Sequence, residues 1–368
     1  MLVDTGAIQR NFLKLKTLTK GRCAAVVKGD GYGHGMRPSA AALHQAGADL
    51  FFCARFEDAA TLREDLGVGP NIAVLDGIPQ SLLHDAAKLG ISPVINSLPQ
   101  LEAAHDFANS SGERLRGFVH IDTAMNRLGL SAQDLGRARR LIPGIAIQAY
   151  MTHFASADDI DLELCRMQVQ RLKDACRHLP PAPLSIANSC ATYLGNEFHG
   201  DIIRPGKSTF GINPLPEGDS PVEQPATVLA TVVQVRTVNK GDPVGYSSSW
   251  RAPTARRVAL VAIGYANGYL RANSSRGQVA IDGQIADVIG RVSMDLIAID
   301  VNELRPDLVH EGTKVEIVGP TISYRRLAQQ AGTNEHEAVI ALGRGCRRVY
   351  VSQASGGYGR SSACGNGW

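Results

Sequence analysis

The first two-thirds of the chain repeats one pattern of hydrophobic and polar positions. A short apolar, β-branched run ends in a polar residue, and a stretch with helical spacing of its apolar residues follows. The runs lie at residues 23–27, 50–54, 72–75, 92–95, 117–121, 146–152, 183–187 and 201–203. Helical stretches lie between them at 39–47, 56–65, 81–90, 98–108 and 162–179. Because most runs are apolar throughout rather than alternating, they indicate strands of a parallel sheet covered by helices.

The number of these strands predicts how the sheet is arranged. Eight strands that alternate with helices are typical of an α/β fold in which the strands close into a (β/α)8, TIM-like barrel. The last helix of the series is poorly marked, so a doubly wound open sheet is the alternative.

After Pro225 the pattern changes to β-rich runs separated by Gly and Pro turns. The runs lie at 227–238, 256–264, 277–290, 296–301 and 313–319, and Asp282-Gly283 is a strong hairpin signal. We therefore expect a second, mostly antiparallel β domain with a Greek-key or barrel core. The predicted division is 1–222 for the barrel and 223–368 for the β domain, with a loose Gly/Ser-rich tail from Ser355.

Composition and charge exclude several classes of protein. The 368 residues are 44% hydrophobic and carry a formal net charge of +3, which gives no reason to expect nucleic acid or a membrane as partner. Seven cysteines without a C-x-x-C pair argue against a disulfide framework and suit a reducing compartment. The N-terminus has no apolar secretory segment, and no run is long enough to span a bilayer. We expect a cytoplasmic protein.

Three familiar motifs fail at one position each. Segment 206–208 resembles the end of a phosphate-binding loop, but Asp201 occupies the required glycine position. A dinucleotide-binding fingerprint after Lys28 would need glycine where the chain has His34. His336 begins a zinc-protease motif whose second histidine is Ile340.

Polar and reactive residues remain at the predicted carboxyl ends of the strands, where barrel active sites lie. They are Lys28, Asp122, Arg127, His153, Asn188, Ser189 and Arg204. The set holds one amine and no carboxylate cluster suited to a divalent metal, so no metal site is expected.

Lys28 is the candidate reactive group. A lysine that ends an apolar strand is about as often a solvated cap, but AAVV before Lys28 desolvates the amine and GDGYGHG after it lets backbone approach closely. A desolvated lysine loses its proton more easily, which Schiff-base formation with a carbonyl requires.

Arg204 and His153 each have a structural and a functional interpretation. Arg204 before Pro205-Gly206 is either half of a surface ion pair or an inward arginine beside amides that bind a phosphate, with Ser189 as a further donor. His153 alone is more readily a core histidine, and beside an aromatic cofactor it would stack on the ring.

These residues lie in segments that resemble the alanine racemases, a family of pyridoxal-phosphate-dependent barrel-type enzymes. AVVKGDGYGHG resembles the family's cofactor-lysine motif, which usually has Ala at the positions of Gly29 and Gly31. HIDTAMNRLGL, MTHFASAD, ANSCAT, IIRPGKSTFG, DPVGYSSSW, IGYANGYLR and VIGRVSMDLIAID resemble its later blocks in the same order. The resemblance runs from about Val3 to Tyr350.

The resemblance implies pyridoxal 5'-phosphate as cofactor, bonded to Lys28. The implied cofactor-binding residues are Lys28, Tyr32, Arg127, His153, Asn188, Ser189, Arg204 and Gly206. Tyr32, Ser189 and Gly206 would hold the phosphate. His153 would stack by the ring and Arg127 would bond its phenolic oxygen. Arg204 would face the pyridine nitrogen, and because a guanidinium pKa exceeds about 12, that nitrogen would stay unprotonated.

A racemase needs one base on each face of the reacting carbon. By the resemblance Lys28 is one base and Tyr246 is the other, although free tyrosine has a pKa of about 10 and Tyr246 alone reads as a strand aromatic. The implied substrate-binding residues are Arg127, Met294 and Asp295. In the family the tyrosine and the Met294–Asp295 stretch come from the partner subunit, so the resemblance implies a head-to-tail homodimer.

The chain departs from the family at several positions. His120 stands where many members have a carbamylated lysine that braces the arginine at 127. Lys207 stands where an apolar residue usually follows R-P-G, and its direction is open. Arg344 best matches a tyrosine that narrows the substrate pocket in some members. These differences put the narrowness of substrate choice in question.

The sequence therefore predicts an alanine racemase that interconverts L- and D-alanine by two-base proton transfer and supplies D-alanine for peptidoglycan. A racemase of broader or serine-type specificity on the same fold is the alternative. A non-catalytic pyridoxal-phosphate carrier is disfavoured, because carriers of that type end after the barrel and lack the domain with Tyr246.

Overall fold

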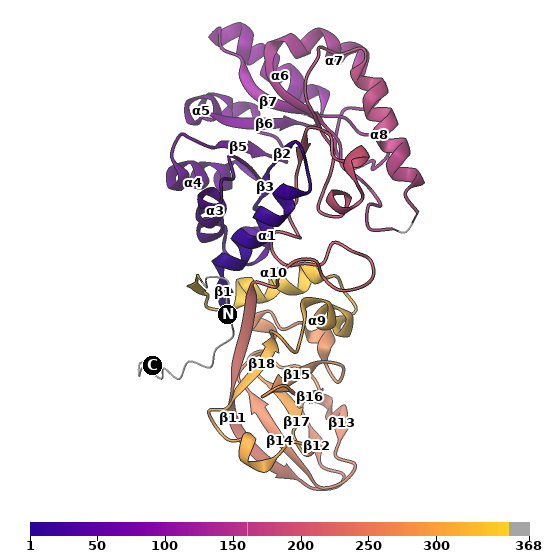
Figure 1. The fold of residues 1–368 in the computed structure, drawn as a ribbon. Coiled ribbons are helices and arrows are strands. Elements are labelled where there is room, and N and C mark those ends of the chain that lie inside the picture. The colour runs from indigo at the N-terminus through magenta and orange to yellow at the C-terminus, as the bar shows by residue number, and fades with distance from the viewer. Residues whose placement is uncertain (160, 353–368) are drawn as a thin grey trace.

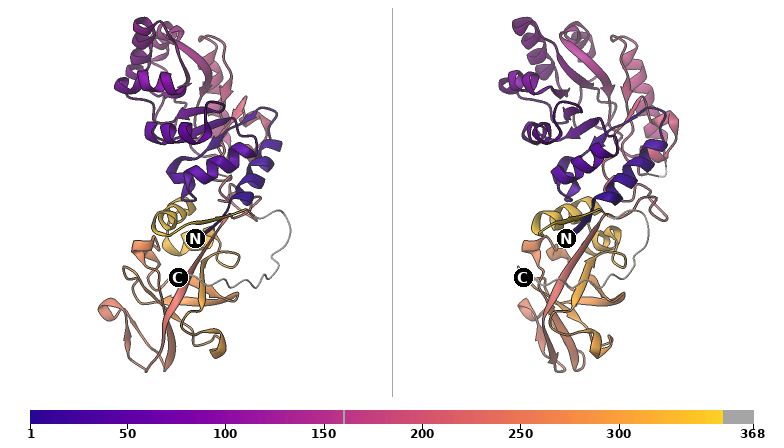
Figure 2. Two further views of the ribbon diagram at one scale, coloured as in Figure 1. Left: turned by 90° about the vertical axis from the view of Figure 1, so that its left-hand side faces the viewer. Right: turned by 60° about the vertical axis from the view of Figure 1, so that its left-hand side comes forward.

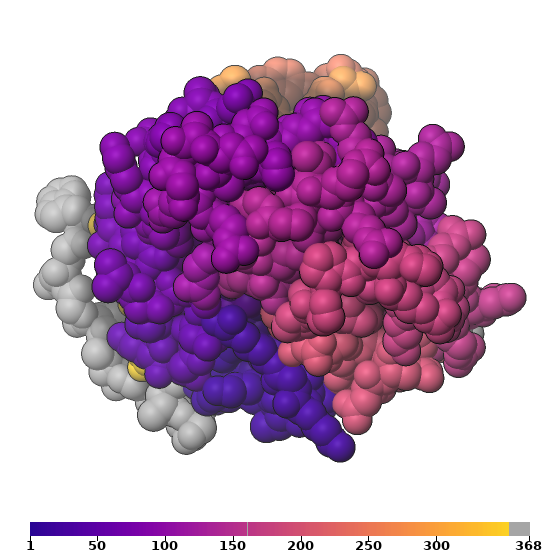
Figure 3. Space-filling model, turned by 90° about the horizontal axis from the view of Figure 1, so that it is seen from above, coloured from indigo at the N-terminus to yellow at the C-terminus, as the bar shows by residue number. Residues whose placement is uncertain are grey.

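The structure is a computed structural model, and it describes residues 1–159 and 161–352. A barrel and a β domain are stacked end to end (Figure 1). Seen from the barrel's end, the barrel hides nearly all of the β domain (Figure 3). The tail that was expected to be loose lies outside the described residues.

The first part of the chain is a closed barrel of parallel strands. In sheet order these are β2 (Arg22–Cys23), β10 (Ile202–Ile203), β9 (Leu184–Ser185), β8 (Ile145–Met151), β7 (Leu115–His120), β6 (Ile91–Ile95), β5 (Asn71–Val74), β4 (Leu50–Cys53) and β3 (Ala25–Val26). Strands β2 and β3 are halves of one run, because only Ala24 separates them. β2 pairs with β10 and β3 pairs with β4, so the sheet closes on itself. The eight expected strands and the barrel are confirmed.

The barrel helices follow the apolar spacing of the sequence. The five expected helices are α3 (Met36–Gln45), α4 (Phe56–Leu66), α5 (Leu83–Leu89), α6 (Leu98–Ser111) and α8 (Glu163–Cys176), and α1 (Thr5–Thr17) and α7 (Leu135–Leu141) add to them. Helix α6 shows the local reason. Ser97 caps it by accepting from Gln100 N, and Leu101, Ala104 and Phe107 form its buried face. No helix among the described residues has the length and apolar character needed to cross a membrane.

The β domain contains a second closed barrel. The sheet order is β14 (Arg256–Val261), β17 (Ile297–Asp300), β16 (Gln284–Ile289), β15 (Gln278–Ile281), β18 (Lys314–Val318), β11 (Ala226–Val238), β1 (Leu2–Asp4) and β19 (Val349–Val351). Strand β11 pairs with β18 through 228–231 and with β14 through 232–238, which closes a ring of antiparallel strands. Asp282 and Gly283 both have positive φ and join β15 to β16, as the hairpin signal predicted.

Two helices of the β domain were not expected. Helices α9 (Tyr324–Ala331) and α10 (Glu335–Gly345) lie between the two barrels in Figures 1 and 2. Strand β1, the first element of the chain, pairs with β11 and β19 of the second sheet. We propose that the division between the two domains lies after residue 222. Strand β1 is the exception, because it precedes the barrel in the chain but pairs in the sheet of the β domain.

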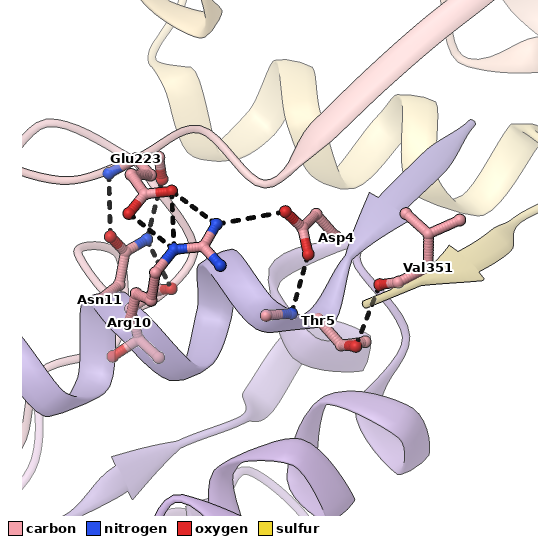
Figure 4. Close-up of polar contacts among 8 residues, drawn as sticks. Asp4, Thr5, Arg10, Asn11, Glu223 and Val351 are labelled. Carbon is pink, nitrogen blue, oxygen red and sulfur yellow. Dashed lines mark hydrogen bonds and ion pairs between the residues drawn. The ribbon is translucent and has the colours of Figure 1, made fainter. Parts of the chain in front are cut away.

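Polar contacts of α1 join the two parts near the connecting segment (Figure 4). The Arg10 guanidinium pairs with Glu223 at 2.7 Å and with Asp4 at 3.3 Å. The Asn11 side chain bonds both the N–H and the C=O of Glu223, each at 2.8 Å. The Thr5 hydroxyl donates to the Val351 carbonyl at 3.1 Å. These contacts fix the path of the chain as it enters the β domain.

Helix α10 packs so closely on the barrel that one of its glycines has no room for a side chain. A Cβ at Gly343 would clash with the carbonyl oxygen of Gly33. We expect Gly343→Ala to lower the free energy of unfolding by about 1–3 kcal/mol, because an overpacked contact between backbones cannot relax easily. The measurement is the urea midpoint followed by circular dichroism.

The matched control for this substitution is Gly136→Ala in α7. Gly136 is exposed, and a Cβ there meets nothing within 4 Å. Alanine at this helical position should leave stability unchanged or raise it by up to about 1 kcal/mol. Equal midpoints for the two variants would contradict the close packing of α10.

Candidate active site

A cavity of about 700 Å³ lies at the carboxyl ends of the barrel strands. All eight residues expected to bind a cofactor line it, namely Lys28, Tyr32, Arg127, His153, Asn188, Ser189, Arg204 and Gly206. Lys28 follows β3, His153 follows β8, and Arg204 follows β10. The barrel therefore gathers side chains that are up to about 180 residues apart in sequence at one end of the sheet.

The backbone after Lys28 makes a left-handed turn. Gly29, Asp30, Gly31 and Tyr32 in α2 (Lys28–Tyr32) have φ values of 63°, 55°, 60° and 51°. A residue with a side chain in this conformation costs roughly 1–2 kcal/mol, so Asp30 and Tyr32 must be held by other contacts. This turn aims the Lys28 amine and the Tyr32 ring into the same cavity.

Side chains from both parts of the molecule stabilise that turn. His34 Nδ1 donates to the carbonyls of Gly31 and Tyr32, at 3.2 and 3.0 Å. Its Nε2 lies 2.9 Å from the Tyr324 hydroxyl of α9 and accepts from it. Arg348 donates to the Asp30 carboxylate at 2.5 Å. The geometry at Lys28 thus depends on the β domain.

The surroundings of Lys28 favour its uncharged form. Burial lowers the pKa of Lys28, the charges of Arg127 and Arg204 lower it further, and Asp76 opposes them. This is the direction that the apolar strand before Lys28 predicted. A lowered pKa makes the amine more readily available as a nucleophile and as a base.

Two hydroxyls and two backbone amides form an uncharged cradle on one side of the cavity. The Ser189 hydroxyl oxygen accepts from the N–H groups of Gly206 and Ser208, at 2.9 and 3.2 Å. A Cβ at Gly206 would overlap the Tyr32 hydroxyl, so only glycine leaves that hydroxyl its place. The Tyr32 ring stacks on Phe210 with centroids 5.2 Å apart, and burial raises its pKa, which keeps it a donor. Because the Ser189 oxygen accepts from two amides, its own O–H, like that of Tyr32, is left to donate to an anion of phosphate size.

Arg204 is a buried cation held in one orientation. Its guanidinium donates to the Ser185 hydroxyl at 2.5 Å and to the Thr152 carbonyl at 2.6 Å. Among the residues that the structure describes, no carboxylate lies within ion-pair distance of it. Burial lowers its pKa to about 10, so it stays charged at neutral pH. The surface ion pair considered for Arg204 is not what the structure has.

The two histidines that lie at barrel strand ends in the cavity are neutral. Burial and the charges of Arg204 and Arg127 lower the pKa of His153 to about 3, and burial and Arg204 lower that of His120 to about 4. His120 Nδ1 lies 2.8 Å from Asn96 Oδ1, and the Asn96 amide nitrogen donates to two backbone carbonyls. Nδ1 of His120 therefore carries the proton and its Nε2 is an acceptor. His120 supplies the cavity with an anchored neutral imidazole.

The structure does not bring Tyr246, Met294 and Asp295 to the cavity of their own chain. None of the three lines it. Tyr246 follows β12 (Pro243–Val244) and precedes β13 (Trp250–Arg251), which lie on the β domain away from the barrel (Figure 1). Tyr246 is 67% exposed and Met294 is 54% exposed. Both are therefore available to contact another molecule.

Helix α10 contributes a cavity residue that sequence reasoning missed. His336 lines the cavity, and its ring centroid lies 5.9 Å from that of Tyr32. Arg344, which was matched to a pocket-narrowing tyrosine, is exposed on the same helix and does not line the cavity. The signal in the sequence was Asn334 followed by Glu337 three residues later, a pattern typical of a helix start. In the structure the Asn334 side chain caps α10 by accepting from Glu337 N. This signal was overlooked because the segment after Pro225 was expected to be mostly β.

Lys207, whose direction the sequence left open, lines the cavity. It also lines an adjoining groove of about 310 Å³, together with Asp158 and His336. Its side chain therefore stands at the edge between the two spaces.

Two protein-family models match the chain. The alanine racemase N-terminal domain matches residues 3–214, and the alanine racemase C-terminal domain matches residues 226–350. Together they cover nearly all of the described residues.

Curated relatives and solved structures agree with these matches. A protein of Mesorhizobium japonicum named "Alanine racemase, catabolic" is 37% identical over 358 residues, covering 95% of this chain and 93% of the relative. The alanine racemase of Rickettsia canadensis is 33% identical, with 95% and 98% covered.

Two crystal structures show the same arrangement of the chain. The alanine racemase of Bartonella henselae, solved with covalently bound pyridoxal phosphate, has a TM-score of 0.92 at 31% identity and covers 95% of this chain and 98% of its own. The biosynthetic alanine racemase of Pseudomonas aeruginosa has a TM-score of 0.88 at 30% identity, with the same coverage. The chain therefore belongs to the alanine racemase family of isomerases.

Proposed function

We propose that this protein is a pyridoxal-phosphate-dependent racemase that interconverts L- and D-alanine by two-base proton transfer. The observation that carries the proposal is one cavity that contains Lys28, the donor cradle at Ser189 and Gly206, and the buried cation Arg204. An amine of lowered pKa beside an anion cradle suits a cofactor that has both an aldehyde and a phosphate.

The residues of this chain fit that cofactor. Tyr32, Ser189 and Gly206 hold the phosphate, and a Cβ at Gly206 would remove the room for the Tyr32 hydroxyl. When bound, pyridoxal phosphate withdraws electrons from the Cα–H bond of an amino acid. Arg204 keeps its own proton, so it donates a hydrogen bond to the pyridine nitrogen without protonating it. His153, which burial and the charge of Arg204 keep neutral, packs beside the ring. Asn188 lines the same cavity as a further cofactor-binding residue.

Arg127 is an exposed residue of the loop after β7, and it lines the cavity. No ion pair of this side chain is present among the described residues. It is therefore free to bond the phenolic oxygen of the cofactor and the carboxylate of the substrate. Met294 and Asp295 of a second copy border the same substrate.

The second base comes from a second copy of the chain. Lys28 serves one face of the substrate carbon and Tyr246 of the partner serves the other, in a head-to-tail homodimer with two shared sites. The exposure of Tyr246 and Met294, and their absence from their own cavity, support this arrangement. The loop of Gly245 packs on the backbone of Arg291, so Tyr246 and Met294 lie on neighbouring loops and would enter the partner together.

We also propose that the D-alanine formed serves peptidoglycan synthesis. Two relatives, from Mesorhizobium japonicum and Agrobacterium fabrum, are named catabolic alanine racemases, so breakdown of D-alanine is the competing role. Enantiomers have equal free energies in water, so the active site does not set the direction. The reactions that supply and consume each enantiomer do.

The test of the function is a spectrum followed by an activity assay. We expect the purified protein to show a visible absorbance band that borohydride abolishes, and to form D-alanine from L-alanine. Lys28→Ala should lose the band and turnover together, because it removes the amine that bonds the cofactor. If the band is present and the protein turns over serine but not alanine, serine would be the substrate in place of alanine. If no band forms after pyridoxal phosphate is added, the proposal would be contradicted.

Tyr246→Phe tests the second base. Removing a general base typically costs about 10²- to 10⁴-fold, so we expect racemisation to fall by that factor while the cofactor band stays. In D₂O the variant should still exchange the Cα hydrogen of one enantiomer, because Lys28 is intact.

The control for this variant is Tyr193→Phe. Tyr193 does not line the cavity, and its hydroxyl is buried without a hydrogen-bond partner among the described residues. Its removal should leave both reactions unchanged. Undiminished racemisation by Tyr246→Phe would exclude Tyr246 as a base.

A further inference from the structure

Lys207 occupies a fixed position next to the phosphate cradle. It lies between Gly206 and Ser208, whose N–H groups both donate to the Ser189 hydroxyl. The Lys207 carbonyl accepts from the N–H groups of Phe210 and Ile212, at 3.1 and 3.0 Å. The backbone of Lys207 is therefore held on both sides, and only its side chain can move.

The side chain of Lys207 reaches toward the cavity. Lys207 lines it beside His336, and its charge affects two groups there. Burial, with the charges of Lys207 and Lys28, lowers the pKa of His336 to about 4. Burial raises the pKa of the Cys190 thiol, and a hydrogen bond and the charge of Lys207 oppose that rise. Both neighbours are thus uncharged at neutral pH, and neither neutralises the ammonium group.

The charges that line the cavity do not balance. Lys28 is left out, because its surroundings favour the uncharged amine. The remaining cations are Arg127, Arg204 and Lys207, and the carboxylates are Asp76 and Asp158, so three positive groups face two negative ones among the described residues. Asp158 is exposed and forms no ion pair with Lys207 within 4.0 Å. This excess of positive charge would attract a phosphate ester, which carries a charge of about −1.5 to −2 at pH 7.

We propose that Lys207 forms a charge-assisted hydrogen bond to the phosphate of the cofactor, and that it converts a cradle of uncharged donors into a cationic site that retains pyridoxal phosphate. This inference rests on the proposed function. It assigns to Lys207 a role that the donors Tyr32, Ser189 and Gly206 do not supply, because each of them is neutral. The site would discriminate between a phosphorylated and an unphosphorylated pyridoxal by charge as well as by shape.

The experiment compares two ligands that differ only in the phosphate. Full-length protein is freed of cofactor with hydroxylamine and titrated with pyridoxal phosphate and, separately, with pyridoxal. Hydrogen bonds to charged groups contribute enough that Lys207→Met should weaken pyridoxal phosphate binding roughly 10- to 100-fold. Pyridoxal affinity should stay within about twofold, because pyridoxal has no group for Lys207 to bind.

Three variants make the result specific. Lys207→Arg keeps the charge and should bind pyridoxal phosphate nearly as well as the native protein. Lys207→Gln tests the charge again should Lys207→Met fold poorly. Lys173→Met in α8 removes one exposed positive charge that does not line the cavity, and should change neither affinity.

The outcomes distinguish a role of Lys207 in phosphate binding from a structural role. Loss of pyridoxal phosphate affinity alone, in both neutral variants, supports the inference. Equal losses for both ligands would mean that Lys207 is structural, and unchanged affinity for both would mean that it does not reach the phosphate. Either result overturns the inference and leaves the proposed function intact. Failure of the native protein to form the band with pyridoxal phosphate would instead remove the proposed function.

Discussion

The left-handed turn after Lys28 is the constraint on which the active site depends. It directs the amine and the Tyr32 hydroxyl into one cavity, and it places Asp30 and Tyr32 in a conformation that side chains disfavour. The β domain stabilises this turn through the Tyr324 hydroxyl on His34 and through Arg348 on Asp30. Helix α10 packs on the same turn, and it does so with a glycine where it meets Gly33. The β domain is thus part of the Lys28 site in its own chain, in addition to its proposed contribution of Tyr246 to a partner.

The second organising feature is electrostatic. Arg204 is buried with neutral acceptors, and His120 and His153 stay neutral beside it. A buried cation without a carboxylate is costly unless something else compensates it. A dianionic cofactor is such a compensation, and it would also be bound more tightly for that reason. Burial is the main cause of the lowered pKa of Lys28, and the positive charges of Arg127 and Arg204 add to it. The charges that would help to retain the cofactor therefore also favour the reactive form of the amine.

The sequence predicted what depends on local patterns. The buried parallel strands are apolar throughout, so their carboxyl ends, and with them Lys28, His153 and Arg204, could be located from the sequence. The closure of the barrel through the halves of one strand, and the pairing of β1 with β11, are contacts between distant segments that no local pattern encodes. Helices α9 and α10 were missed because β-rich runs precede them, so the whole segment after Pro225 was interpreted as mostly β.

Individual side chains were harder to predict than elements. Lys207 follows a proline and a glycine, and its backbone position is fixed because its carbonyl accepts from the N–H groups of Phe210 and Ile212. His336 enters the cavity only because α10 docks on the barrel. Tyr246 was identified through family resemblance, since an exposed tyrosine far from its own cavity gives no sign of chemistry.

We propose that each active site combines Lys28 of one copy with Tyr246 of another. The most direct test is to co-express Lys28→Ala and Tyr246→Phe chains with different tags and to purify the mixed dimer. If the bases come from different copies, one of the two sites in the mixed dimer keeps both native residues, and about half of the native activity should return. If both bases came from the same chain, every site would lack one base, and a mixed dimer as inactive as its parents would contradict the account.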